Sequence, residues 1–178
     1  GDTIDFTGVC AGPVVVRTGG LTILGVGNAV NEGGGRDALA NAVTPLVRDP
    51  DVGCVAGCVQ VLNPDQSIFT RFLNCTFSLS FKFVRAYQNE FRGVFCTPGA
   101  VSVYRADVVR RVADEWLNQR FLGKPCATGE DRAMTNLFLR EGWMTAYQGN
   151  AVVWAKMPHT YGGVTRMFLR WARSNLGE

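Results

Sequence analysis

The sequence predicts an α/β protein. Stretches with apolar residues at helical spacing, such as 37–47 and 106–121, alternate with shorter runs of small and branched apolar residues, such as 52–62. This alternation is typical of a sheet that is flanked by helices. Because 178 residues with 47% hydrophobic content are enough to bury a single sizeable core, we expect one domain.

Residues 1–36 carry the weakest structural signal. They are rich in Gly and Val, and only the stretches 14–16 and 21–26 have the pattern of short strands. We interpret residues 1–36 as an insertion or a poorly ordered N-terminal segment, and residues 37–178 as the folded part of the chain.

The next part of the chain predicts a helix, a strand and a long helix. Residues 37–47 carry an apolar stripe at helical spacing, and residues 52–62 have the composition of a strand buried on both faces. Residues 67–91 form a helical stretch rich in aromatic side chains. Such a stripe usually packs in a core, and a helix that faces a membrane or a channel is the alternative.

Two patterns that look like metal sites have a simpler explanation. Asp49 and Asp51 are spaced like a metal-binding acidic pair, but Pro50 and the strand that follows place them in a turn. The six cysteines include no Cys-x-x-Cys, and the single histidine leaves a zinc site with little support. We expect reduced thiols, with Cys54 and Cys58 packed in the buried strand.

The second half of the chain predicts further strands and helices. They are a strand, loop and strand over 93–104 around Thr97-Pro98-Gly99, a helix over 106–121, a helix over 133–143, strands over 142–147 and 151–155, and a basic helix over 164–175. Gly99 has two explanations: close approach of a ligand to the backbone, or a tight turn that needs a glycine φ angle.

An acidic pair, Glu130 and Asp131, lies where a loop turns into a helix. Thr128 is placed to cap this helix, with Asp131 three residues further on in the spacing of a capping box. The N–H groups and the dipole at a helix N-terminus favour ionised carboxylates, and an ionised carboxylate held in this way suits a general base. The alternative is that both acids only cap and charge the first turn.

The charge balance points to no particular macromolecular partner. A net charge of +3 is mild, so we expect no nucleic acid partner and assign most arginines to solvated surface. No apolar run in the sequence is long enough to span a bilayer.

Four motifs occur in a fixed order along the chain. They are Asp49-Pro50-Asp51 followed by Val52-Gly53-Cys54-Val55-Ala56-Gly57, Thr97-Pro98-Gly99 leading to Tyr104-Arg105, Gly129-Glu130-Asp131-Arg132, and Leu169-Arg170-Trp171-Ala172-Arg173-Ser174. Together they resemble the processive, inverting family-2 glycosyltransferases of GT-A fold, which include hyaluronan synthases, chitin synthases and rhizobial chitooligosaccharide synthases. The resemblance runs from about Arg36 to the end of the chain.

The resemblance implies a fold and a set of roles. The fold is a partial GT-A-like mixed sheet flanked by helices, the acceptor-side half of a catalytic domain without its N-terminal nucleotide-binding half. Asp131 is implied to be the general base, with Glu130 and Arg132 holding its loop. Pro98 and Gly99 are implied to lie against the acceptor sugar.

The remaining family positions concern the leaving group, the acceptor and a cation. Arg170 matches the residue that meets the diphosphate, and Trp171 offers a flat face for a sugar ring. Asp2 is implied to be the surviving ligand of an Asp-x-Asp motif for a divalent cation, Mg²⁺ or Mn²⁺; an ordinary terminal aspartate is the alternative. Met167 departs from the pattern, because the family has Gln at this position.

The implied reaction is the transfer of N-acetylglucosamine from a UDP-sugar donor to a growing β-linked glycan acceptor, with inversion. The alternatives are a non-processive family-2 transferase acting on a lipid or cell-wall glycan, and a degenerate glycan-binding homologue without catalysis. A membrane partner is implied through segments outside this chain, at the cytoplasmic face of the plasma membrane. We expect the 178-residue chain alone to be inactive or nearly so.

Overall fold

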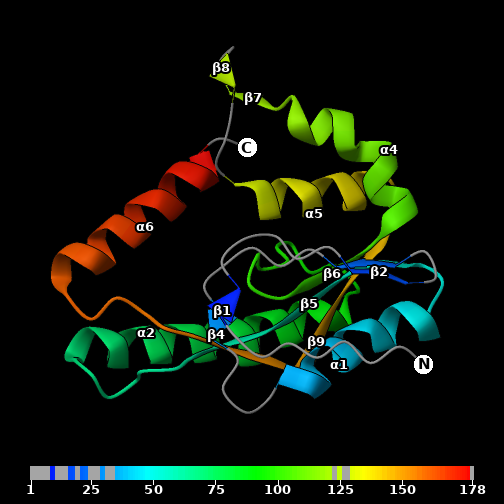
Figure 1. Ribbon diagram of the computed structural model, residues 1–178. Coiled ribbons are helices and arrows are strands. Elements are labelled where there is room, and N and C mark those ends of the chain that lie inside the picture. The colour runs from blue at the N-terminus through cyan, green and yellow to red at the C-terminus, as the bar shows by residue number, and fades with distance from the viewer. Residues whose placement is uncertain are drawn as a thin grey trace.

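The computed structural model shows a mixed sheet with helices on both of its faces (Figure 1). Helices α4 (Ala106–Leu117) and α5 (Glu130–Arg140) cover one face, and α1 (Gly35–Arg48) and α2 (Ile68–Ser78) lie on the other. The α/β class expected from the sequence is therefore confirmed. The structure describes residues 9–10, 16–18, 21–23, 29–30, 35–121, 124–125 and 129–176.

The described strands form one large sheet in the order β1-β4-β9-β5-β6-β3-β2. Its centre is β5 (Val52–Val61), which pairs in parallel with β9 (Met144–Ala155) and antiparallel with β6 (Ser102–Arg105). The outer strands are β1 (Val9–Cys10), β2 (Val16–Thr18), β3 (Leu21–Ile23) and β4 (Ala29–Val30). A separate hairpin pairs β7 (Arg120–Phe121) with β8 (Lys124–Pro125).

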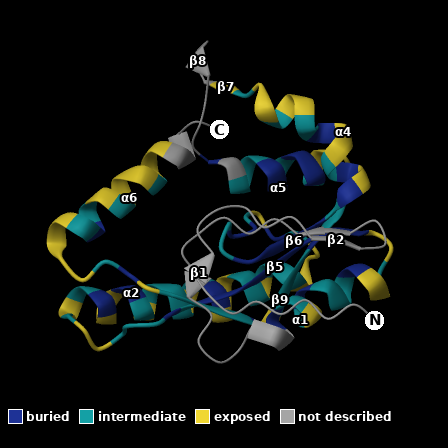
Figure 2. Cartoon of the chain, viewed as in Figure 1, coloured by how far each residue is buried: buried dark blue, intermediate teal, exposed yellow. Residues whose placement is uncertain are grey.

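Strand β5 is buried on both faces, as its sequence predicted (Figure 2). Successive side chains of a strand point to opposite faces. Cys54 accordingly packs with Phe138 in the cluster under α4 and α5, whereas Val55 packs with Ala42 in the cluster under α1. The central strand thus joins the two halves of the core.

Several element boundaries differ from the predicted ones. The two strands expected over 142–147 and 151–155 are one strand, β9, whose register against β5 shifts between Gly57 and Cys58. Helix α4 ends at Leu117, because the chain continues into the β7–β8 hairpin. The first strand expected over 93–104 is reduced to one bridge between Gly93 and Thr145.

The aromatic-rich helix expected over 67–91 forms in three successive segments. They are α2, the π-helical segment η1 (Leu79–Arg85) and α3 (Ala86–Glu90). The wider π-helical turn changes the phase of the side chains, and such turns are frequent at functional sites. The aromatic stripe divides accordingly: Phe81 is buried in the core, whereas Phe83 and Tyr87 are exposed.

The last helix, α6 (Tyr161–Leu176), packs against α2. The Phe69 and Tyr161 rings of the two helices lie 6.2 Å apart, and an apolar groove of about 640 Å³ runs between the helices. None of the helices in the described residues is both long enough and apolar enough to cross a membrane.

Candidate active site

Asp131 lies in the first turn of α5, where the sequence placed it. The helix begins at Glu130, and the cap residue is Gly129, which adopts a left-handed φ of 94°. Glycine tolerates this conformation because it has no Cβ. The prediction of Thr128 as the cap is therefore wrong by one position; Thr128 itself lies outside the described residues.

The Asp131 carboxylate is held at the N-terminus of α5. Its Oδ1 accepts the backbone N–H of Arg132 at 2.8 Å, and the residue is half-buried. The N–H groups of a first helical turn have no partner within the helix, so they are available to a side-chain acceptor at this place. The side chain of Glu130 lies outside the described part of the chain.

Thr97, Pro98 and Gly99 form a loop, called the 97–99 loop, that leads into β6. The Pro98 carbonyl accepts the N–H of Val101 at 3.1 Å and the hydroxyl of Ser102 at 2.5 Å. Gly99 is not among the described glycines with a positive φ. The explanation that this turn requires a glycine φ angle is therefore wrong, and close approach of a ligand remains the prediction for Gly99.

Buried hydrogen bonds join the 97–99 loop to α5. The Thr97 N–H donates to Thr135 Oγ1 at 3.0 Å, and the Thr135 hydroxyl donates to the Asp131 carbonyl at 2.7 Å. On its other side, Thr97 Oγ1 lies 2.7 Å from the Tyr104 hydroxyl. The structure thus brings Asp131, Pro98 and Gly99 together through two residues, Thr135 and Tyr104, to which the sequence analysis gave no role.

Arg85 is a third residue that the sequence analysis missed. Its Nε donates to the Cys96 carbonyl at 3.3 Å, and its Nη1 donates to Ser80 Oγ at 2.6 Å. Burial lowers the pKa of Arg85, and the Asp131 carboxylate is one of the neighbouring groups that oppose this shift. The guanidinium therefore lies within the electrostatic reach of Asp131 and fixes the residue that precedes the 97–99 loop.

Arg170 and Trp171 lie on α6, away from direct contact with Asp131. The Trp171 ring centroid is 6.0 Å from that of Phe77 and 5.5 Å from that of Phe168, and Arg170 is exposed. Within the part of the chain that the structure describes, no hydrogen bond or ion pair joins Asp131 to Arg170 or Trp171.

A run of ring contacts nevertheless connects α6 to the 97–99 loop. The Phe77 ring that touches Trp171 stacks on Phe81 at 5.8 Å, and the Arg85 guanidinium lies 4.0 Å from the Phe81 centroid. Such a cation over an aromatic face is attracted by the ring quadrupole. Trp171 and the 97–99 loop are therefore linked through α2 and η1.

Comparisons with known proteins identify the family of this chain. Residues 34–174 match the family described as Glycosyltransferase like family 2. The chain belongs to the family-2 glycosyltransferases. The resemblance drawn from the four sequence motifs is thereby confirmed.

Several curated glycosyltransferases are similar to this chain. An N-acetylglucosaminyltransferase of Rhizobium meliloti is 36% identical over 132 residues, which are 74% of this chain and 31% of the relative. Human hyaluronan synthase 3 is 32% identical over 133 residues, which are 75% of this chain and 24% of the relative. The chain thus spans a third or less of the length of these two relatives.

A solved structure shows the same fold. A mannosyltransferase from Pyrobaculum calidifontis, in complex with GDP-Man and Mn²⁺, superposes with a TM-score of 0.59 at 20% identity. The match covers 89% of this chain and 38% of the mannosyltransferase chain. The expected GT-A-like sheet of the glycosyltransferase is therefore confirmed as a partial domain.

Met167 replaces the Gln expected in the family-2 pattern, and its position explains why Met is tolerated. Its side chain packs beside the buried cluster that includes Val61, Leu73 and Val164. Methionine fills irregular apolar space of this kind well. At this point of α6, the side chain contributes to packing against β5 and α2.

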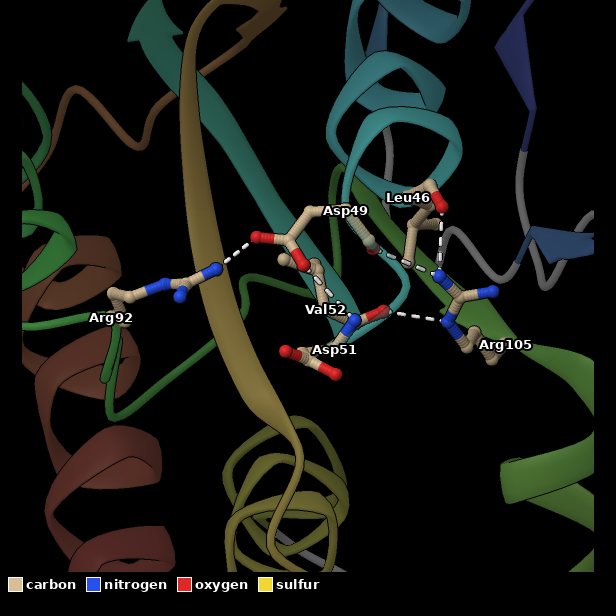
Figure 3. Close-up of polar contacts among 6 residues, drawn as sticks. All are labelled: Leu46, Asp49, Asp51, Val52, Arg92 and Arg105. Carbon is tan, nitrogen blue, oxygen red and sulfur yellow. Dashed lines mark hydrogen bonds and ion pairs between the residues drawn. The ribbon is translucent and has the colours of Figure 1, made fainter.

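Asp49 and Asp51 form the turn that the sequence predicted (Figure 3). Asp49 Oδ1 accepts the Asp51 N–H at 3.0 Å, and its other oxygen pairs with the Arg92 guanidinium. Arg105 donates to the carbonyls of Leu46, Asp49 and Val52, so it ties the end of α1 to the start of β5. The turn is therefore a structural junction of the glycosyltransferase domain.

The described residues do not form a cation site. They contain no group of three or more His, Cys, Asp or Glu side chains arranged to hold a metal ion. Asp2, the metal ligand implied by the sequence, lies outside the described residues. Among the cysteines with described side chains, Cys54, Cys58 and Cys75 are free thiols.

Replacing either turn aspartate should leave cation use unchanged. We expect the Asp49→Asn and Asp51→Asn variants of the full-length protein to require the same Mn²⁺ concentration for sugar transfer as the wild-type protein. The half-exposed pair with Arg92 contributes at most about 1 kcal/mol to stability, because water and salt screen it. The check is the transfer rate as a function of Mn²⁺ concentration; an increase of about tenfold in the concentration required would identify a metal role.

Restoring the family residue at Met167 should destabilise the domain. Met167→Gln places an amide beside an apolar cluster, so we expect a loss of about 1–2 kcal/mol in unfolding free energy and no gain in transfer rate. Denaturant unfolding followed by tryptophan fluorescence measures the first quantity. The exposed neighbour provides the control, since Arg166→Gln should change stability by less than about 0.5 kcal/mol. A faster and equally stable Met167→Gln enzyme would contradict the packing role.

Proposed function

We propose that the full-length protein transfers N-acetylglucosamine from a UDP-sugar to the end of a growing β-linked glycan, with inversion at the anomeric carbon. The observation that carries the proposal is the half-buried Asp131 carboxylate at the start of α5, joined by buried hydrogen bonds to the 97–99 loop. The name N-acetylglucosaminyltransferase of one relative supports this sugar, and the name hyaluronan synthase of another supports a glycan product.

Asp131 acts as the general base in this proposal. It takes the proton of the attacking acceptor hydroxyl as the new glycosidic bond forms, a contribution of about 10²–10⁴-fold in rate. Its Oδ1 already accepts the Arg132 N–H, and Oδ2 carries no hydrogen bond to the described residues. We therefore assign Oδ2 as the proton acceptor. Attack from one face, without a covalent intermediate, gives inversion.

Arg170 and Trp171 serve the leaving group and the acceptor. The exposed Arg170 guanidinium donates paired hydrogen bonds to the diphosphate, whose negative charge grows as the bond to the sugar breaks. Trp171 packs against Phe77 and Phe168 and presents its remaining surface to a sugar ring. The contacts through Phe77 and Phe81 to Arg85 keep this surface in a constant relation to the 97–99 loop.

The competing proposal is a glycan-binding homologue without catalysis. The absence of the family Gln at Met167 favours it, because no amide is available there to position the acceptor. The packing of Met167 in an apolar cluster weighs against it, since the residue supports the fold of α6.

Asp131→Asn separates the two proposals. The amide keeps the size of the side chain but cannot take up the proton, so we expect the transfer rate to fall by about 10²–10⁴-fold. UDP binding, measured by calorimetry on the full-length protein, should stay at the wild-type affinity. Asp114→Asn removes an exposed carboxylate on α4 and should leave both quantities unchanged. Full transfer by Asp131→Asn would rule out Asp131 as the base.

We further propose that transfer requires a divalent cation. Support comes from the mannosyltransferase of the same fold, whose structure holds GDP-Man and Mn²⁺. A divalent cation neutralises charge on a leaving diphosphate. We expect a chelator to abolish transfer by the full-length protein, and added Mn²⁺ or Mg²⁺ to restore it. Transfer at the wild-type rate in excess chelator would contradict the proposal.

A further inference from the structure

Three hydroxyl groups meet in the core between the 97–99 loop and α5. They belong to Tyr104 on β6, Thr97 in the loop and Thr135 on α5. Thr97 and Thr135 are 0% exposed and Tyr104 is 4% exposed. Groups buried to this degree need partners within the protein, because no bulk water reaches them.

The hydrogen-bond partners allow only one order of donors and acceptors among these three hydroxyl groups, which form a row. The Thr135 hydroxyl has one proton, which it donates to the Asp131 carbonyl at 2.7 Å. At the contact of 2.8 Å between the two threonine oxygens, Thr97 must therefore be the donor. Since the Thr97 proton is used there, the Tyr104 hydroxyl donates to Thr97 at 2.7 Å. The row runs from Tyr104 through Thr97 and Thr135 to Asp131.

Tyr104 is the first donor of the row, and its side chain is fixed by packing in the core. Its ring packs against Phe138 with a centroid distance of 5.6 Å, within the cluster that α4 and α5 bury on the sheet. Burial raises the pKa of Tyr104, which favours the protonated hydroxyl that can act as a donor. Strand β6 also pairs directly with the central strand β5.

Both ends of the row reach residues of the proposed reaction. At the loop, Thr97 directly precedes Pro98, whose carbonyl is fixed by Ser102 at 2.5 Å. At the helix, Thr135 binds the carbonyl of Asp131, the residue whose carboxylate is the proposed base. The Thr97 N–H donates to the same Thr135 oxygen at 3.0 Å, so two bonds from one residue join loop and helix.

We propose that Tyr104, Thr97 and Thr135 form a hydroxyl relay that sets the position of the Asp131 carboxylate relative to the acceptor side of the site, the 97–99 loop. The inference rests on the proposed function. The three are positioning residues, because they act through Asp131 and Pro98. A displacement of about 1 Å between a base and its substrate costs roughly 10²-fold in rate, so a rigid link between these two elements controls turnover.

The relay predicts a loss of turnover that protein stability does not explain. Thr135→Val keeps the shape of the side chain and removes the link, so we expect kcat for transfer to fall by about 10–100-fold in the full-length protein. UDP affinity should stay within about twofold, because the row contacts no proposed donor residue. Thr135→Ser restores the hydroxyl and should recover most of kcat.

A second substitution tests the far end of the relay. Tyr104→Phe keeps the ring contact with Phe138 and removes only the first donor, so kcat should fall by a smaller factor of about 3–10. In the double variant with Thr135→Val, kcat should match that of Thr135→Val alone, because residues acting in one row are not additive. If Thr135→Val does not fold, Tyr104→Phe decides the question by itself.

Thr70→Val is the matched control. Thr70 is equally buried, and its hydroxyl bonds to the carbonyls of Pro64 and Ser67 at the start of α2, away from the relay. Its loss should lower the thermal unfolding midpoint while kcat stays at the wild-type value. A wild-type kcat for a folded Thr135→Val protein would overturn the relay, and so would an equal loss of kcat in Thr70→Val.

Asp131→Asn, assayed alongside, distinguishes the two possible failures. If Asp131→Asn loses transfer and Thr135→Val keeps it, the base assignment stands and the relay is wrong. If Asp131→Asn keeps transfer, the base assignment of the proposed function fails, and the relay fails with it because it acts through that base. Loss of kcat in both variants, with recovery in Thr135→Ser, supports both.

Discussion

The burial of β5 on both faces is the constraint on which the domain depends. Two glycines make this close packing possible. A Cβ at Gly53 would lie 2.6 Å from the Cβ of Trp143, and a Cβ at Gly57 would lie 2.7 Å from the carbonyl oxygen of Ala151. Contacts as short as these do not occur, so β9 and the end of α5 approach β5 only because the side chain is absent. The approach of α5 to the sheet also brings Thr135 to Thr97 of the 97–99 loop and Phe138 to Tyr104 of β6.

The site combines polar groups with a core that excludes water. Thr97, Thr135 and Tyr104 are buried with their hydrogen bonds completed among themselves and with the backbone, which avoids the cost of an unpaired polar group. A network of this kind is rigid because each member has a single acceptable arrangement. A further hydrogen bond restrains the chain just before the loop, because Arg85 Nε donates to the Cys96 carbonyl.

Helix α6 is attached to the site by aromatic contacts. Trp171 touches Phe77, which stacks on Phe81, and Phe81 lies under the guanidinium of Arg85. The same helix contributes Met167 to an apolar cluster at the end of β5. In this family-2 glycosyltransferase, one surface of α2 and η1 therefore sets both the packing of α6 and the position of Trp171. Polar contacts to Asp131 are not needed to hold α6 or Trp171 in position.

The sequence by itself determined the local elements and the family. Periodicity and spacing among residues close together in the sequence were enough to predict these features. They are the apolar patterns of α1 and β5, the position of Asp131 in the first turn of α5, and the four motifs. Only the tertiary structure decided which residues surround Asp131. Thr97 and Thr135 are 38 positions apart, and Arg85 reaches Cys96 from the end of a π-helical segment. Such pairs depend on how the helices pack on the sheet. A hydrogen bond between hydroxyl groups across the core produces no periodic pattern in the sequence.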